Sequence, residues 1–384
     1  MLIGLVILHE LGHFIAARRS GVEVEEFGIG FPPKAKTIGR KNGTEYTLNW
    51  LPLGGFVRLK GEHDSDTEPG TFGQASLANK VKIMLAGVVI NALIAIVLMS
   101  VVAATALPQV LDDQFSVASD TTVVKHDVVM AFIVPGSPAE QAGLEAGDRL
   151  LSLTPTACDN DCRVAIDDSD DVRDVTPGLA GQEVVVEFVD DSTDETRMST
   201  VIFQTERQIE QSKEDNEECI GRGDDESDCP YTQSFLGVVP DDYIEQRSTW
   251  SAPVVGVVFS VQVAQETLVN FGQIIGGLFQ GDTEAAQQQV TGIVGIGYIL
   301  GDLAERGFAS VLFLTAIISL SLAIMNALPI PALDGGRLFV TLLFRALKKP
   351  LTKEVEERIH GSGFVALMLL FVLITVLDVQ RFIL

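Results

Sequence analysis

The chain has 384 residues, 47% of them hydrophobic, with a formal net charge of −25 and a mean hydropathy of +0.29. Such a hydropathy is high for a soluble protein and points to a membrane protein. Residues 107–250 hold 33 acidic against nine basic side chains, so the acidity is local, and its repulsion of phosphate excludes nucleic acid as a partner.

The first seventeen residues contain two histidines and a glutamate in an otherwise apolar segment. In a helix, His9 and His13 lie four residues apart on one face and can bind one zinc ion, with Glu10 about 100° round from His9. Zinc lowers the pKa of a bound water to roughly 7, and Glu10 can accept the proton of that water. The H-E-x-x-H pattern therefore predicts a catalytic zinc site.

This opening segment is short, and no cationic residues precede its apolar stretch, so it is not typical of a signal peptide. We expect that the first turns of a transmembrane helix are missing from the chain.

The sequence near His13 offers no clear third zinc ligand, because no H-x-x-G-x-x-H continuation follows. Candidates by proximity alone are Glu23, Glu25 and Glu26. Asp334 is a better candidate, since Pro329 and Pro331 break the apolar segment just before it and leave carbonyls and a carboxylate facing inward. A carboxylate there is costly unless a metal or hydrogen bonds hold it.

Residues 22–62 alternate in polarity and are interrupted by glycine and proline, which predicts short strands joined by turns. Open strand edges cannot face lipid, so this hairpin must pack against helices or line a watery cavity. A hydrolytic site needs such a cavity.

Three apolar segments predict membrane spans: residues 83–107 and 308–333, which carry no charge, and the shorter segment 361–377. Ten lysines and arginines lie between Arg18 and Lys82 and six between Arg337 and Arg358, so both stretches are expected on the cytoplasmic side and the acidic region outside. Residues 252–279 carry a single charge and predict an amphipathic helix on the membrane surface.

The acidic region contains, at residues 133–153, the pattern of a strand, a Pro-Gly turn, a short helix and a second strand. This pattern resembles a PDZ domain, which binds peptides by adding a strand to a sheet edge. Acidic stretches such as residues 211–229 predict solvated loops. All four cysteines lie in this acidic region: Cys158, Cys162, Cys219 and Cys229. In an oxidising compartment they can form disulfides, for which three pairings are possible. The alternative is that they are free thiols or form a metal site.

Four motifs occur in order: HELGH at 9–13, GTEYTLNWLPLGGFVRLKGE at 43–62, AGVVIN at 86–91 and NALPIPALDGGR at 326–337. With a single PDZ-like domain, they resemble the bacterial site-2 proteases of the regulator-of-sigma-E type, which are zinc intramembrane metalloproteases. Val88 stands where such proteins usually carry proline.

The resemblance implies one zinc ion per chain, held by His9, His13 and Asp334, with Glu10 as the general base. It also implies that Asn326 contacts or positions the substrate. The hairpin around Gly54 and Gly55 is expected to re-enter the membrane and to pair with an unwound substrate segment as an added strand.

The predicted fold is a polytopic α-helical membrane protein with about four transmembrane helices, the first truncated, a membrane-reentrant β-hairpin and an extracytoplasmic PDZ-like α+β domain. Residues 1–107 and 308–384 form the protease core, 108–250 the PDZ-like domain with acidic insertions, and 251–307 the membrane-surface segment.

The predicted function is hydrolysis of single-pass membrane proteins in or near their transmembrane segments, for example anti-sigma factors or signal-peptide remnants. The expected location is the bacterial cytoplasmic membrane, with the active site towards the cytoplasm. Further expected partners are the lipid bilayer and a peptide ligand of the PDZ-like domain. The alternative is a catalytically inactive membrane scaffold that uses its PDZ-like domain to hold partners.

Overall fold

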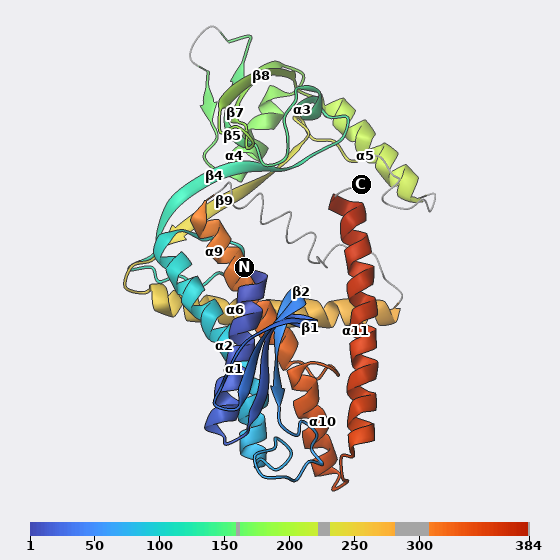
Figure 1. Cartoon of the computed structure of the whole chain (residues 1–384). Helices are drawn as coiled ribbons and strands as arrows, with labels where there is room; N and C mark the ends of the chain where they lie inside the picture. The colour runs from blue at the N-terminus through green and yellow to red at the C-terminus, as the bar shows by residue number, and fades with distance from the viewer. Residues whose placement is uncertain (159–161, 222–230, 281–306, 383–384) are drawn as a thin grey trace. The chain divides into compact units, whose positions relative to one another are not determined.

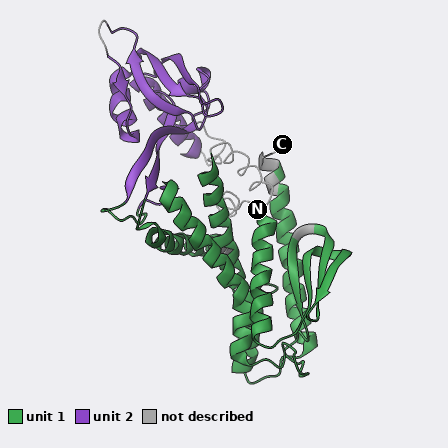
Figure 2. Ribbon diagram, turned by 60° about the vertical axis from the view of Figure 1, so that its left-hand side comes forward, with its two compact units in different colours: residues 1–107, 113–120, 248–384 green, residues 108–112, 121–247 purple. Residues whose placement is uncertain are grey.

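The computed structural model describes residues 1–158, 162–221, 231–280 and 307–382. The chain forms two compact units (Figure 2). Unit 1 contains residues 1–107, 113–120 and 248–384, and unit 2 contains residues 108–112 and 121–247.

Unit 1 is built from long helices and one β-hairpin (Figure 1). Its helices within the described ranges are α1 (Leu2–Arg19), α2 (Leu77–Thr105), α6 (Ala252–Gln280), α9 (Phe308–Ala327), α10 (Asp334–Ala346) and α11 (Lys353–Phe382). Among the described residues, α2, α6, α9 and α11 are long and apolar enough to cross a membrane. These helices, together with the sheets, fit a polytopic membrane protein.

The four span-length helices differ in part from those predicted. Helix α1 is not among them, because its 18 residues include Glu10, Arg18 and Arg19. Helix α6 is among them, although the sequence predicted a surface helix there; its place at the membrane surface stays a prediction. Residues 281–306 of the predicted surface segment lie outside the described residues.

Helix α2 shows how an apolar helix divides its surface between protein and surroundings. The Ser76 hydroxyl caps its first turn by accepting a hydrogen bond from the Asn79 amide at 3.3 Å. One stripe of α2, with a residue every four positions, remains exposed and consists of Val89, Leu93, Val97 and Val101. A stripe of aliphatic side chains left open in this way is expected to face lipid.

Strands β1 (Val24–Lys41) and β2 (Thr44–Leu59) form an antiparallel two-stranded sheet that contacts α1 (Figure 1). Their turn is Asn42–Gly43, and both residues have positive φ, as a tight hairpin turn requires. A hairpin is therefore present in residues 22–62, as expected, but it consists of two strands of 18 and 16 residues joined by one turn and not of short strands. Re-entry of this hairpin into the membrane stays a prediction.

The helical structure is interrupted between α9 and α10, at a segment that contains Pro329 and Pro331. Proline cannot continue a helix, so α9 ends at Ala327 and α10 begins at Asp334. Two glycines then allow α10 to pack against the break: a Cβ on Gly335 would lie 2.3 Å from the Ala327 carbonyl oxygen, and a Cβ on Gly336 would lie 1.9 Å from the Ile330 carbonyl oxygen. The start of α10 is thereby fixed, and with it the carboxylate of Asp334.

A network of charged residues joins the loop after β2 to α10 and α11. Buried Glu356 accepts a hydrogen bond from the Asp64 amide at 3.1 Å, and its carboxylate lies 3.8 Å from the Arg337 guanidinium. Arg337 also donates to the Glu62 carbonyl, and Asp64 pairs with buried Lys80. The two basic stretches of the sequence thus meet at one end of unit 1.

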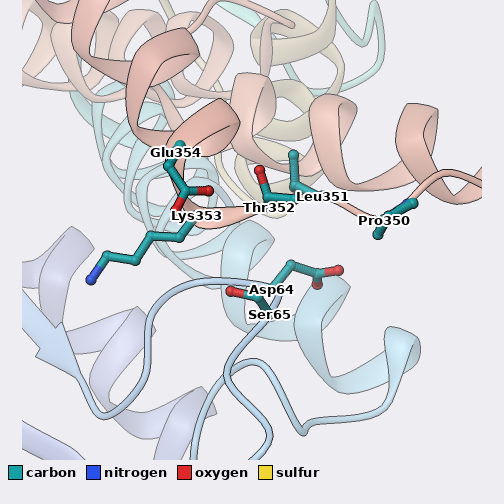
Figure 3. A pocket seen from close by; sticks show the side chains of 7 residues that line it. All are labelled: Asp64, Ser65, Pro350, Leu351, Thr352, Lys353 and Glu354. Carbon is teal, nitrogen blue, oxygen red and sulfur yellow. The ribbon is translucent and has the colours of Figure 1, made fainter.

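At the same end, Asp64 and Ser65 face residues 350–354, at the start of α11, across a cavity of about 400 Å³ (Figure 3). The loop after β2 and the start of α11 are therefore neighbours, with space between them that opens to solvent.

Segment 113–120 of unit 1 is held to the start of α6 by one carboxylate. Asp120 accepts hydrogen bonds from the amide and hydroxyl of Ser251, at 2.9 and 2.6 Å, and from the amide and hydroxyl of Thr249. Partial burial opposes ionisation, but these bonds outweigh it and hold the pKa of the Asp120 carboxyl well below its usual range. An ionised Asp120 also suits its place at a helix N-terminus.

Unit 2 is an α+β unit around one seven-stranded sheet in the order β3-β9-β4-β5-β7-β8, with β6 beside β5. The strands are β3 (Leu107–Pro108), β4 (Thr122–Ile133), β5 (Arg149–Pro155), β6 (Val164–Ala165), β7 (Glu183–Val189), β8 (Thr196–Ile202) and β9 (Val238–Arg247). Its helices are α3 (Pro138–Gln141), α4 (Ser169–Val175), the 3-10 turn η1 (Thr176–Leu179) and α5 (Glu206–Gly221). The strand, helix and strand expected over 133–153 correspond to β4, α3 and β5, while a PDZ identity stays a prediction.

The prediction of a solvated loop at residues 211–229 is wrong in its first half, which belongs to helix α5. The helix forms because Ile209 and Cys219 are buried on one side while the acidic side chains face solvent. Cys219 is disulfide-bonded, and Cys158 is bonded to Cys162. Cys229 lies outside the described residues.

Candidate metal centre

His9 and His13 lie on the side of α1 that faces the interior of unit 1, and both are buried. They are one helical turn apart, so their rings meet edge to face with centroids 4.8 Å apart. Their Nε2 atoms are only 3.1 Å apart. Two imidazole nitrogens that converge in an apolar environment can supply two of the four ligands of a tetrahedral zinc site.

Asp334 completes the cluster from a position 321 residues further along the chain than His13. Its Oδ2 atom lies 3.0 Å from His9 Nε2 and 3.1 Å from His13 Nε2. In the part of the chain that the structure describes, this is the one group of three or more potential ligands whose donor atoms converge closely enough for a metal ion.

The three donor atoms fit zinc in both spacing and type. They form a triangle with edges of 3.0 to 3.1 Å. Two ligands in a tetrahedral zinc site with bonds of roughly 2.0 Å lie about 3.3 Å apart, so a small adjustment suffices. Two histidines and one carboxylate are also the ligand set of many catalytic zinc sites, in which the fourth position is left to water or substrate.

Gly87 on α2 provides the space that the cluster needs. A Cβ atom at this position would lie 2.5 Å from the Nε2 atoms of both His9 and His13, which is too close for any side chain. Gly12 on α1 has the same role towards the α2 backbone, since its Cβ would lie 2.7 Å from the Ala86 carbonyl oxygen. The two glycines let α1 and α2 approach closely where the ligands meet.

Glu10 borders the cluster without belonging to it. Together with His13, Asp334 and Arg337 it lines a cavity of about 100 Å³. A polar cavity of this size has room for water molecules. Glu10 and two of the three ligands, His13 and Asp334, thus border one small polar space whose wall is otherwise largely apolar.

The three glutamates proposed as alternative ligands are engaged elsewhere. Glu23 pairs with Lys60 at 3.2 Å, while Glu25 and Glu26 pair with Arg58 at 3.4 and 2.6 Å. All three lie at or next to the start of β1. The structure therefore brings Asp334, rather than any of these glutamates, to the two histidines.

The predicted substrate-binding residues lie at two places around the centre. Gly55 of β2 passes beside α1, where an added Cβ would lie 3.6 Å from Glu10 Cγ, and Gly54 has a φ of +121° that favours glycine. Asn326 lies in the last turn of α9, and its amide donates to the Leu322 carbonyl at 3.0 Å. Among the described residues Asn326 makes no hydrogen bond to the ligand cluster.

Comparison with known proteins gives one consistent result. The model of peptidase family M50 matches residues 1–370. A protein of Clostridium perfringens named "putative zinc metalloprotease" is 29% identical over 376 residues, which is 98% of this chain and 95% of that protein. Zinc metalloprotease RasP of Geobacillus kaustophilus is 26% identical over 98% of this chain and 96% of its own length.

Replacement of Asp334 tests the proposed third ligand. Asp334→Ala is expected to reduce the zinc content of purified protein from about one ion per chain towards zero after dialysis, because two histidines alone hold zinc weakly. Metal analysis by mass spectrometry measures this content. Glu23→Ala is the control and should leave it unchanged; the reverse pattern would place the third ligand at the start of β1.

A methyl group at Gly87 tests the space for the ion. Alanine favours a helix more than glycine does, so Gly87→Ala should fold, but overpacking costs about 1–3 kcal/mol and should weaken zinc binding by about 5- to 150-fold. Competition with a chromogenic chelator measures this affinity. Gly4→Ala on α1, where an added Cβ meets nothing within 4 Å, is the matched control. Equal zinc affinity of both variants would refute the role of Gly87.

Proposed function

Because the chain belongs to peptidase family M50, whose members are site-2 zinc metalloproteases, we propose that it hydrolyses peptide bonds in or near the transmembrane segments of single-pass membrane proteins. The observation that carries this proposal is the meeting of His9, His13 and Asp334 beside Glu10 among helices suited to a membrane. An inactive scaffold has no need to keep all four residues, and all four are in place.

In the proposed mechanism, one zinc ion per chain is bound by His9, His13 and Asp334. When bound, zinc supplies a Lewis acid that polarises the scissile carbonyl and makes a bound water acidic. Glu10 takes the proton of the attacking water and returns it to the leaving amine. Its position on α1, next to a ligand but outside the ligand triangle, suits this shuttle.

The hairpin is the proposed site of substrate binding. At Gly55 the β2 backbone approaches Glu10 without an intervening side chain, so an extended peptide paired with the hairpin would pass close to the general base. In a transmembrane helix the backbone groups are hydrogen-bonded to one another within the helix. The helix must therefore unwind before a protease can reach its peptide bonds. Pairing with a strand replaces the hydrogen bonds lost on unwinding, and Asn326 is proposed to help position the substrate.

The proposed substrates are single-pass proteins such as anti-sigma factors or signal-peptide remnants. Unit 2 is proposed to act as a PDZ-like domain that binds a peptide segment of such partners outside the cytoplasm. Its acidic surface argues against nucleic acid as a partner.

The chain is proposed to lie in the bacterial cytoplasmic membrane with its active site towards the cytoplasm. The contacts of Arg337 with Glu62 and Glu356 support a common side for the two basic stretches. Helix α2 starts beside these stretches and is 29 residues long, which corresponds to about 43 Å and suffices to span a bilayer. In the sequence the acidic region follows α2 and the first basic stretch ends within its first turns, so a single crossing of the bilayer by α2 is proposed to separate the two.

Glu10→Gln tests the mechanism. The amide cannot accept the proton of water, so cleavage of a model transmembrane substrate should fall by at least about 10²- to 10⁴-fold while zinc remains bound. Cleavage is measured in detergent or proteoliposomes, and zinc by mass spectrometry. Glu25→Gln, which changes an exposed glutamate of the hairpin, should cleave normally. Undiminished cleavage by Glu10→Gln would reject this mechanism.

Thiol labelling tests the orientation. Each cysteine of the chain lies in residues 108–250, so after reduction a membrane-impermeant maleimide should label the protein in intact spheroplasts. Ser65→Cys, in a variant whose four cysteines are replaced by serine, should be labelled only in inverted vesicles, because exposed Ser65 lies in the loop after β2, within the stretch from Arg18 to Lys82 that is expected on the cytoplasmic side (Figure 3). The opposite pattern would contradict the proposed orientation.

A further inference from the structure

Asn91 is an almost fully buried amide on α2, placed beside the first histidine of the metal centre. Its Nδ2 atom lies 3.3 Å from Nδ1 of His9, the ring nitrogen that does not point at Asp334. Its Oδ1 atom is buried and has no hydrogen-bond partner among the described residues. A buried amide oxygen without a partner is costly, so this environment calls for a donor that the oxygen can reach.

His9 provides such a donor when it binds a metal through Nε2. An imidazole that binds a metal through one nitrogen while neutral carries its hydrogen on the other. The Nδ1–H of His9 then needs an acceptor, and a half turn of the Asn91 amide exchanges its nitrogen and oxygen without changing its shape. Oδ1 would then accept the His9 hydrogen, so the buried oxygen of Asn91 and the Nδ1–H of His9 would each have a partner.

The second histidine already has the equivalent arrangement. His13 Nδ1 lies 2.7 Å from the Ile83 carbonyl oxygen, which can only accept, so that nitrogen carries the hydrogen and Nε2 is free for a metal. Ile83, Gly87 and Asn91 follow each other at intervals of four on α2 and therefore share one face. This face offers an acceptor for His13, open space for an ion, and an acceptor for His9.

We propose that Asn91 is a positioning residue of the metal centre, whose Oδ1 accepts the Nδ1–H of His9 and so fixes the tautomer and the ring orientation that present Nε2 to zinc. The inference rests on the proposed function only in taking zinc as the ion. It assigns a role to the last residue of the AGVVIN motif, which the ligand set and the general base leave unexplained.

The experiment compares zinc affinities of full-length variants in detergent, measured by competition with a chromogenic chelator. Asn91→Leu has a similar volume but no acceptor, and its zinc affinity should fall by about 10- to 100-fold, the usual effect of losing a group that orients a metal ligand. Asn91→Asp keeps an acceptor oxygen and should stay within about threefold of the wild type. Cobalt substitution supplies a second readout, since the visible spectrum should change in Asn91→Leu and not in Asn91→Asp.

Ser319→Ala is the matched packing control. The Ser319 hydroxyl donates to the main-chain carbonyl of Asn91 at 2.8 Å, so this variant disturbs the same place on α2 but keeps the amide. Its zinc affinity should equal that of the wild type. The inference is overturned if Asn91→Leu binds zinc as tightly as the wild type, or if Asn91→Asp or Ser319→Ala loses as much affinity as Asn91→Leu.

These outcomes are independent of the test of the proposed function. Zinc affinity is measured without substrate, so a cleaving Glu10→Gln variant would reject the mechanism and leave the role of Asn91 open to measurement. An unchanged affinity in Asn91→Leu would reject that role and leave the protease mechanism intact.

Discussion

Three polar atoms that meet within 3.1 Å of each other between apolar helices are the constraint on which unit 1 depends. Histidines and a carboxylate are expensive in an environment without water unless they satisfy one another or share a metal ion. To bring them together, α1 and α2 must approach at Gly12 and Gly87, and α10 must begin where α9 has just ended. The small residues, the helix break and the buried network around Glu356 all serve this one arrangement.

The sequence alone predicts the residue types and chemical roles of the site better than it predicts how those residues are brought together. His9, Glu10 and His13 form a local pattern, because the helix alone sets their relative directions. Asp334 could be proposed because prolines precede it in an apolar segment, but only the fold removes the nearby glutamates from competition by pairing them with Arg58 and Lys60. Ligands from one helix can therefore be predicted from spacing, whereas ligands from two helices need the packing between them.

The contributions of Gly87 and Asn91 were outside the reach of sequence reasoning for the same reason. A glycine in an apolar helix is normally read as tolerated or as a packing residue, and nothing in the nearby sequence indicates which helix it will face.

The prediction of a loop over residues 211–229 was wrong for a different reason. Net charge suggested solvation, but burial of Ile209 and Cys219 on one face is enough to hold α5, so a few apolar side chains outweighed the charge of the others.

The two units distribute their polar and apolar residues in opposite ways. Unit 2 carries most of the excess negative charge, which favours hydration of its surface, while its core is an apolar interior around Met130, Leu153 and Val184. Unit 1 presents aliphatic side chains outwards and keeps its polar groups inside. The proposed cleavage of segments buried in lipid requires this arrangement, because water, the base and the metal ligands must be enclosed by protein before they can act at that depth. The apolar residues around His9 and His13 are part of this enclosure, and the cavity beside Glu10 is the space it protects.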